Sequence, residues 1–427
     1  MNRLSTVQYA SMSDIGFRRR NNQDAFAIKM CSDQAEWESF GHMFLVADGM
    51  GGHAVGELAS KIAADSLPHI YFKDQNPDRS QALKQSIEAT NHAINERGTL
   101  NQEFARMGTT CSALLIGPFG ALIGHVGDSR VYRVRARAIE QLTFDHSLQW
   151  ELMRLGRMSP EEIMLSQPRN IITRSLGPES HVEVDLEGPY PVAAGDTFVI
   201  CSDGLTSHVS DEEIGTITGE LPPVRACRLL VNLANLRGGS DNITVVVVQV
   251  QGNGQNNPPA DLEPEPSRFE ASWMTLLGTW SLAVILVLGI LLLLADHPER
   301  GIPLIVSSVF LMVVLGTWRW QMFRERRQSQ PRSKSSAPYR HASAKLTRRF
   351  ISDLAALQAE LERSAVDEGW EVNWTEHQQL HQTAQNSISS RNLVPAFDAY
   401  AQMLDLMMNA IQLQRRQLSN DSKNATE

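Results

Sequence analysis

Residues 273–295 form a run of 23 residues without a charged side chain, dominated by leucine, isoleucine and valine. A helix of this length crosses a hydrocarbon core about 30 Å thick. A six-residue turn leads to a second uncharged stretch, residues 302–318. The alternative is a helical hairpin buried in a soluble core, but neither stretch has a polar face and tryptophans stand at their ends. The sequence therefore predicts two transmembrane helices.

The charges that flank these stretches predict their orientation. Residues 319–334 contain six arginine or lysine residues against one glutamate, whereas the turn between the two stretches contains one arginine. Basic residues favour the cytoplasmic side of a membrane. The first twenty residues contain no apolar run that would serve as a secretion signal. We therefore expect a protein of the inner (cytoplasmic) membrane with two spans and both termini in the cytoplasm.

The remaining sequence divides around this hairpin. The expected segments are a body at 1–251, a linker rich in Gly, Asn, Pro and acidic residues at 252–272, spans at 273–295 and 302–318, a basic low-complexity segment at 319–344 and a helical region at 345–417. A net charge of −9 gives no reason to expect nucleic acid as a partner. The four cysteines lie far apart, which indicates reduced thiols rather than a zinc site or disulfides.

The body mixes strand and helix patterns in blocks. Strands are expected at 43–47, 109–116, 121–126, 131–135, 182–186, 197–201 and 243–250, and helices at 56–71, 78–97, 147–155 and 222–236. Such blocks favour an α+β fold with packed antiparallel sheets flanked by helices. Beyond residue 345, apolar residues recur at helical spacing, and Thr375 with Gln378 predicts a capping box.

Aspartates stand at the ends of several apolar strand patterns: Asp48, Asp128, Asp203 and Asp241. An Asp-Gly pair after a strand is most often a plain turn. Four carboxylates gathered at one sheet edge, however, would repel one another unless cations intervened, and an all-oxygen set favours Mg²⁺ or Mn²⁺. Two such ions can activate water and polarise a phosphoryl group. Arginines at 18–20 could hold the phosphate oxygens, because a guanidinium matches their geometry.

Eight motifs in order along residues 6–251 carry a resemblance to a known family. They are SDIGFRRRNNQDAF, VADGMGGHAVGELAS, MGTTCSALL, HVGDSRVYR, LTFDHS, ITRSLG, CSDGL and SDNITVVVV. The chain resembles the bacterial members of the metal-dependent Ser/Thr protein phosphatases of type 2C. This resemblance implies a sandwich of two antiparallel sheets flanked by helices. It also implies hydrolysis of phosphoserine and phosphothreonine in proteins by water activated between two Mn²⁺ or Mg²⁺ ions.

The resemblance also implies roles for individual residues. Asp48 bridges both metal ions, the carbonyl of Gly49 binds one of them, and Asp203 and Asp241 complete the other. Asp128 matches a ligand of a third, weaker metal, together with Asp203 and a flap at residues 157–174. Arg19 matches the phosphate-binding arginine, and Asp24 orients a water from outside the metal ligands.

Two positions depart from the family pattern. Gln23 replaces the usual glutamate, which removes one negative charge and predicts weaker metal binding. Met50 stands where animal members carry a histidine proposed to protonate the leaving group, so no side chain at that position can donate a proton. His53 is close in sequence, but a surface position on the turn into a helix is the better interpretation.

Other phosphatase chemistries are excluded, because no cysteine is followed six positions later by arginine and no Asp-x-Asp motif occurs. The remaining alternative is a catalytically weak, membrane-tethered sensor or scaffold derived from a phosphatase. The expected partners are phosphorylated proteins near the membrane, including membrane Ser/Thr kinases. The C-terminal helical region is a candidate for self-association.

Overall fold

The structure is a computed structural model that describes residues 7–51, 53–100, 102–104, 106–156, 171–251, 287–288, 290–295, 299–300, 302–308 and 337–424. It divides into two compact units, residues 1–256 together with 337–427, and residues 257–336. The predicted linker and most of both predicted spans lie outside the described residues. Within the described ranges, no helix combines the length and apolar character needed to cross a membrane.

The larger unit contains two antiparallel sheets, as the sequence predicts. One has the order β1 (Val7–Asp14), β11 (Ile243–Val250), β10 (Thr197–Cys201), β7 (Arg130–Arg135), β8 (Ala138–Gln141) and β12 (Arg340–Ser343). The other has the order β2 (Asp24–Lys29), β3 (His42–Met50), β5 (Cys111–Gly117), β6 (Gly120–Val126) and β9 (Asp185–Tyr190), with β4 (Gly108–Thr109) paired to β3. Every pairing within them is antiparallel.

The central strands are apolar on both faces, because each sheet is covered on both sides. In β11, Val246 and Val248 pack between the two sheets, whereas Val245 and Val247 pack toward the helices. Successive side chains of a strand point to opposite faces, so a strand buried on both sides reads as a continuous apolar run. The four valines at 245–248 satisfy this requirement.

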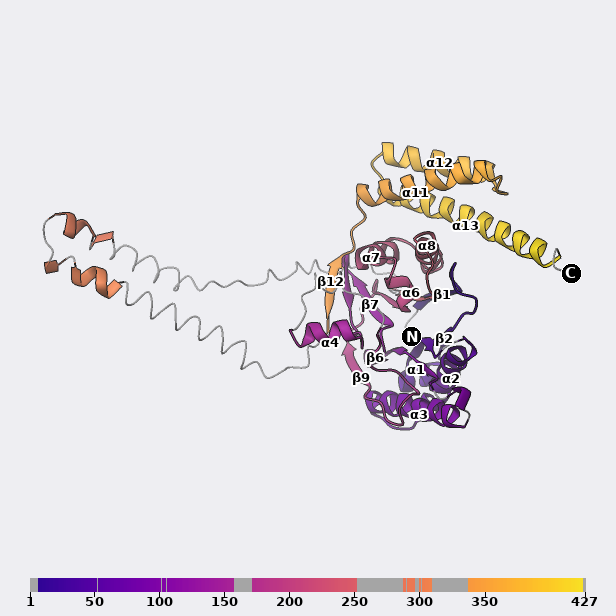
Figure 1. The fold of residues 1–427 in the computed structure, drawn as a ribbon, viewed down its shortest axis with the longest axis horizontal. Coiled ribbons are helices and arrows are strands. Elements are labelled where there is room, and N and C mark those ends of the chain that lie inside the picture. Colours follow the sequence, from indigo (N-terminus) through magenta and orange to yellow (C-terminus); the bar gives the residue numbers. More distant parts are fainter. Residues whose placement is uncertain are drawn as a thin grey trace. The chain divides into compact units, whose positions relative to one another are not determined.

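Helices form the outer layers (Figure 1). Helices α2 (His53–Tyr71) and α3 (Arg79–Thr99) pack on the second sheet, and α7 (Asp211–Glu220) and α8 (Pro223–Leu236) pack on the first. Shorter elements are α1 (Gln34–Phe40), η1 (Gln102–Phe104), α4 (Leu148–Arg154) and α6 (Asp203–Thr206). A capping box between Ser210 and Glu213 starts α7, and proline in the first turn starts α8.

The C-terminal region packs directly on this sandwich. It contains β12 followed by α11 (Arg348–Asp367), α12 (Trp374–Ser389) and α13 (Leu393–Asn424). Strand β12 pairs with β8 at the edge of the first sheet, although the sequence places it in the low-complexity segment. Its residues are mostly polar and exposed, so no apolar pattern marks it. Helix α12 begins at Trp374 and is capped by Asn373, not by the predicted box at Thr375.

Helices α13 and α8 share one hydrophobic core. Phe397, Leu404 and Met407 of α13 are buried with the apolar side of α8. Salt bridges join the same helices, with 2.6 Å between Arg225 Nη1 and Asp398 Oδ2 and 3.0 Å between Arg228 Nη1 and Asp405 Oδ2. The C-terminal helices are therefore continuous with the core of the sandwich.

Candidate active site

The predicted site aspartates lie at the ends of sheet strands or close to them. Asp24 begins β2 and lies directly opposite Asp48 near the end of β3. Asp203 follows β10 and starts α6, while Asp241 lies two residues before β11. Asp128 follows β6. Because β10 and β11 are neighbours in one sheet and β2 and β3 in the other, the fold brings together residues far apart in the sequence.

Four of the predicted side chains and Gly49 line one cavity of about 530 Å³. We call it the carboxylate cavity; its predicted site residues are Arg19, Asp48, Gly49, Asp203 and Asp241. Asp24 is not among the residues that line this cavity. Asp128 lines an adjoining cavity of about 690 Å³, which Asp203 also borders. Asp203 is thus common to both cavities.

Burial and mutual repulsion weaken the acidity of these carboxyl groups. Burial raises the pKa of Asp24 to about 7 and that of Asp203 to about 6, and Asp241 adds to both shifts. The pKa of Asp48 is raised well above its usual range by burial and by Asp24. Burial and Asp203 raise the pKa of Asp128 in the same way. At neutral pH this cluster favours a bound cation, because full ionisation without one is costly.

The donor set fits a hard divalent cation. Asp128 Oδ1 is buried without a hydrogen-bond partner, and it is a carboxylate oxygen of the kind that Mg²⁺ and Mn²⁺ prefer. In the described part of the chain, no three His, Cys, Asp or Glu side chains already surround a single metal position. The carboxylates therefore supply oxygen donors of the right chemical kind.

Arg19 neutralises part of this charge. Its Nη2 lies 2.6 Å from Asp241 Oδ2, and its side chain is 46% exposed. Arg19 belongs to the loop of residues 15–23, which we call the arginine loop. The guanidinium therefore stands at the open side of the carboxylate cavity, where an incoming anion would meet it.

Gly49 is required by the close approach of two backbone segments. A Cβ at this position would lie 2.1 Å from the carbonyl oxygen of Gly56 and 2.6 Å from that of Gln23. No side chain fits between these fixed backbone atoms. The backbone that follows Asp48 in β3 can therefore lie against these segments at the cavity only if residue 49 is glycine.

Two residues that support the site have no role assigned from the sequence. Ser202 Oγ donates to Asp24 Oδ2 at 2.7 Å. The side chain of Asn242 accepts a hydrogen bond from the backbone N–H of Gln23 and donates to the carbonyls of Ile15 and Asn21. Asn242 therefore joins both ends of the arginine loop to β11. Its position beside Asp241 in a quoted motif is the only sequence signal for this role.

The two departures from the family pattern lie at the cavity. Gln23 and Met50 both line it, so the amide and the thioether occupy the places of the expected glutamate and histidine. The side chain of His53 and residues 157–170 of the predicted flap lie outside the described residues. Ile172, just beyond that segment, bridges to Ser147 and also lines the cavity.

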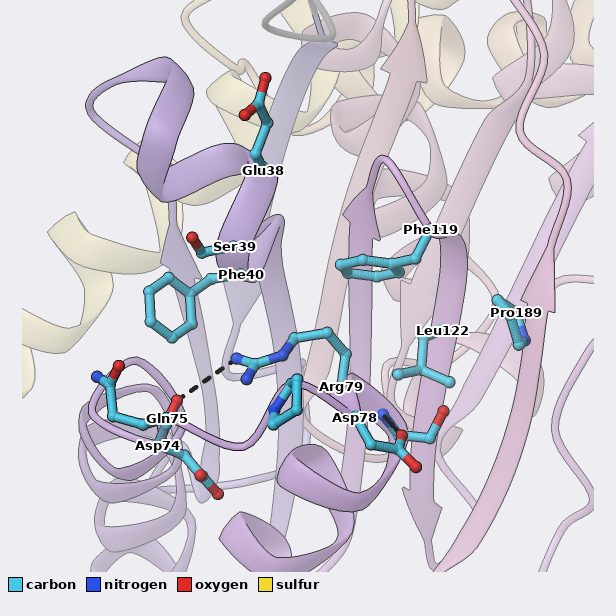
Figure 2. Close-up of a pocket in the computed structure, with 12 residues that line it drawn as sticks. Glu38, Ser39, Phe40, Asp74, Gln75, Asp78, Arg79, Phe119, Leu122 and Pro189 are labelled. Atoms are coloured by element: carbon cyan, nitrogen blue, oxygen red, sulfur yellow. Dashed lines mark hydrogen bonds between the residues drawn. The ribbon is translucent and has the colours of Figure 1, made fainter.

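Another cavity, of about 620 Å³, contains none of the predicted site residues (Figure 2). In it, the Arg79 guanidinium lies over the rings of Phe40 and Tyr71, with centroid distances of 5.1 and 5.8 Å. Its Nη1 donates to the backbone carbonyl oxygen of Asp74 at 3.5 Å, and Glu38 and Asp78 also line the cavity. These contacts account for Arg79 as part of the packing between α1 and the start of α3.

Known proteins that resemble this chain are protein phosphatases of type 2C. A family model described as protein phosphatase 2C matches residues 18–227. A Streptococcus pyogenes protein named putative protein phosphatase 2C-type is 39% identical over 240 residues, covering 55% of this chain and 94% of the relative. Protein phosphatase PhpP of Streptococcus pneumoniae is 34% identical over 249 residues, covering 57% of this chain and 98% of that protein.

Solved structures agree with these sequence relatives. The crystal structure of the Mycobacterium tuberculosis serine/threonine phosphatase PstP is 34% identical, with a TM-score of 0.52, and the match covers 58% of this chain and 99% of that one. The serine/threonine phosphatase of S. agalactiae is 36% identical, with a TM-score of 0.53, covering 58% of this chain and all of that one. The matched part accounts for a little over half of this chain.

Proposed function

This chain belongs to the protein phosphatase 2C family and is a serine/threonine protein phosphatase, and from that premise we propose that it hydrolyses phosphoserine and phosphothreonine at the carboxylate cavity with Mn²⁺ or Mg²⁺. The observation that carries the proposal is the convergence of Arg19, Asp48, Asp203 and Asp241 on this cavity. A catalytically weak scaffold would have no need to gather partly buried carboxylates whose pKa values are raised by desolvation and mutual repulsion.

The residues divide into metal ligands and groups that handle substrate. Asp48, the Gly49 carbonyl, Asp203 and Asp241 would hold two ions, and Asp128 with Asp203 would hold a third. Two bound ions supply the acidity that makes water a nucleophile at neutral pH and polarise the phosphoryl group.

Arg19 and Asp24 act on substrate and water. The Arg19 guanidinium, which lines the cavity beside Asp241, binds phosphate oxygens with its planar fork. Asp24 Oδ2 accepts a hydrogen bond from Ser202 Oγ, which leaves Oδ1 available to accept a hydrogen bond from a water and so orient it. Met50 supplies no proton to the leaving group.

We expect the purified full-length chain to hydrolyse an aryl phosphate and a phosphothreonine peptide only when Mn²⁺ or Mg²⁺ is present. Release of inorganic phosphate measures both reactions. Arg19→Ala should raise KM for both substrates by about tenfold, because a bidentate contact to the phosphate is lost. Equal turnover with and without metal would contradict the proposal.

We also propose that residues 273–295 and 302–318 anchor the chain in the inner membrane, with both termini in the cytoplasm. The uncharged apolar sequences and the basic residues after the second stretch support this placement. The tether would raise the local concentration of membrane-associated phosphoproteins, and transmembrane Ser/Thr kinases are the substrates that we expect.

Alkaline extraction of membranes tests this anchor. The full-length chain should stay in the membrane pellet, whereas a variant with residues 257–336 replaced by a Gly/Ser linker should move to the supernatant. The variant should keep its turnover of aryl phosphate, because the carboxylate cavity lies in the other compact unit. Recovery of the full-length chain in the supernatant would contradict the anchor without touching the assigned chemistry.

A further inference from the structure

The arginine loop is held to the catalytic body at several points. The backbone N–H groups of Phe17 and Arg18 both donate to the carbonyl oxygen of Gly239, at 2.9 and 3.1 Å. Asn242 fixes the two ends of the loop through the carbonyls of Ile15 and Asn21. The segment from Arg18 to Arg20 remains exposed. Because Phe17 directly precedes this exposed segment, the positions of the guanidinium groups of Arg18 to Arg20 depend on the contacts that hold Phe17 in place.

Arg415, on the last part of α13, contacts this same residue. Its Nη2 donates to the carbonyl oxygen of Phe17 at 3.1 Å, and its guanidinium carbon lies 4.2 Å from the centroid of the Phe17 ring. Two interactions of one side chain thus restrain both the backbone and the ring of Phe17. Arg19 follows only two positions later, so a displacement of Phe17 would be passed to it.

Helix α13, which carries Arg415, is held in place by its packing and salt bridges with α8. Its buried Phe397 and Leu404 share the core of α8, and the Arg225–Asp398 and Arg228–Asp405 salt bridges join the two helices. Helix α8 in turn leads into Gly239, which accepts both loop N–H groups. The α8 segment and α13 therefore restrain the arginine loop together, one from the catalytic body and one from the C-terminal region.

We propose that Arg415 is a positioning residue of the phosphatase, which keeps the Arg19 guanidinium at the carboxylate cavity by holding Phe17. The docked C-terminal region thereby sets the affinity of the active site for the phosphate group. This inference rests on the proposed function, in which Arg19 binds phosphate oxygens. It assigns to α13 a role in substrate binding and leaves the chemical step to the residues of the cavity.

Inorganic phosphate is the probe that tests this role, because as a competitive product it reports phosphate binding without a leaving group. In the full-length chain, Arg415→Ala should raise the inhibition constant for phosphate and KM for an aryl phosphate by about tenfold, since small misplacements of a positioning group are costly. The value of kcat should change by less than about threefold. Arg363→Ala removes the same charge from an exposed position on α11 and serves as the matched control.

Two further variants separate positioning from folding. Arg415→Lys keeps a cation beside the ring but lacks the planar fork, so it should restore part of the phosphate affinity. In an Arg19→Ala background, Arg415→Ala should have no further effect on kcat/KM, because its influence passes through Arg19. Melting temperature, measured on every variant, reports the fold independently.

The outcomes are distinguishable. A loss of kcat alone in Arg415→Ala, with unchanged KM and inhibition constant, would indicate less folded enzyme and overturn the inference. A full tenfold loss in the Arg19→Ala background would also overturn it. Wild-type chain without metal-dependent turnover would contradict the proposed function instead, whereas active wild type with unchanged phosphate binding in Arg415→Ala would contradict only the role of Arg415.

Discussion

Asp48→Asn should lower kcat/KM for an aryl phosphate by about 10³-fold or more, the largest effect expected of any single substitution. Asp48 lies half-buried near the end of β3 and lines the carboxylate cavity, where it would contact both metal ions. Loss of metal-ion stabilisation of several kcal/mol corresponds to a rate effect of about this size. Turnover at saturating Mn²⁺, measured as phosphate release, provides the test.

Asp65→Asn is the matched control for this variant. It removes the same charge from an exposed position on α2, outside the carboxylate cavity, and should leave turnover unchanged. Asp48→Asn itself should fold, because the pKa of Asp48 is raised and an uncharged amide relieves repulsion from Asp24. Full activity in Asp48→Asn, with a normal melting temperature, would show that the metal ligands are assigned wrongly.

Removal of the metal ions should abolish turnover and make stability depend on pH. Asp24 and Asp203 have pKa values raised from 3.8 to about 7 and about 6. A carboxyl group whose pKa is raised by folding stabilises the metal-free protein at low pH, and that stability is lost as pH rises through 6 to 7. Bound cations displace these protons, so metal affinity should increase over the same range.

Thermal unfolding measures this linkage. The metal-free chain should melt at a lower temperature at pH 8 than at pH 5.5, and Mn²⁺ at about 100 times its dissociation constant should add about 2.7 kcal/mol of stability. The gain at a fixed Mn²⁺ concentration should be larger at pH 8. Asp48→Asn provides the comparison, because it should respond weakly to the metal. An equal Mn²⁺ effect at both pH values would argue against binding by these carboxylates.

Asp48 and Asp203 could be predicted from the sequence because each lies close to the end of a strand with two buried faces, whereas Asp24 follows only from the family resemblance. The continuous apolar runs at residues 43–47 and 198–201 identify these strands, and close packing at residue 49 demands glycine. Burial of both strand faces and the need for glycine at residue 49 therefore each produce a pattern that can be recognised in the sequence. The two antiparallel sheets follow from the same strand signals together with the block order of helices and strands.

The rest of the site depends on contacts between residues far apart in the sequence, and no short sequence pattern predicts these contacts. Ser202 meets Asp24 across 178 positions, and Arg415 meets Phe17 across 398. Strands β1 and β12 lie at the edges of their sheet and carry polar residues, so they lack the apolar runs that identify β11. The position of such an edge strand is determined by the neighbouring strand with which it pairs, and that pairing cannot be predicted from the sequence of the edge strand itself.

Strand β12 means that the first sheet is completed by chain that lies beyond residues 257–336. That segment is therefore an insertion whose two ends are fastened to a single folded body, one after β11 and one before β12. A fragment that stops at residue 251 would leave β8 with open hydrogen-bonding groups and the apolar side of α8 bare to water. The isolated fragment of residues 1–251 would consequently be prone to aggregate. In the full-length chain, β12 pairs with β8 and α13 covers the apolar side of α8.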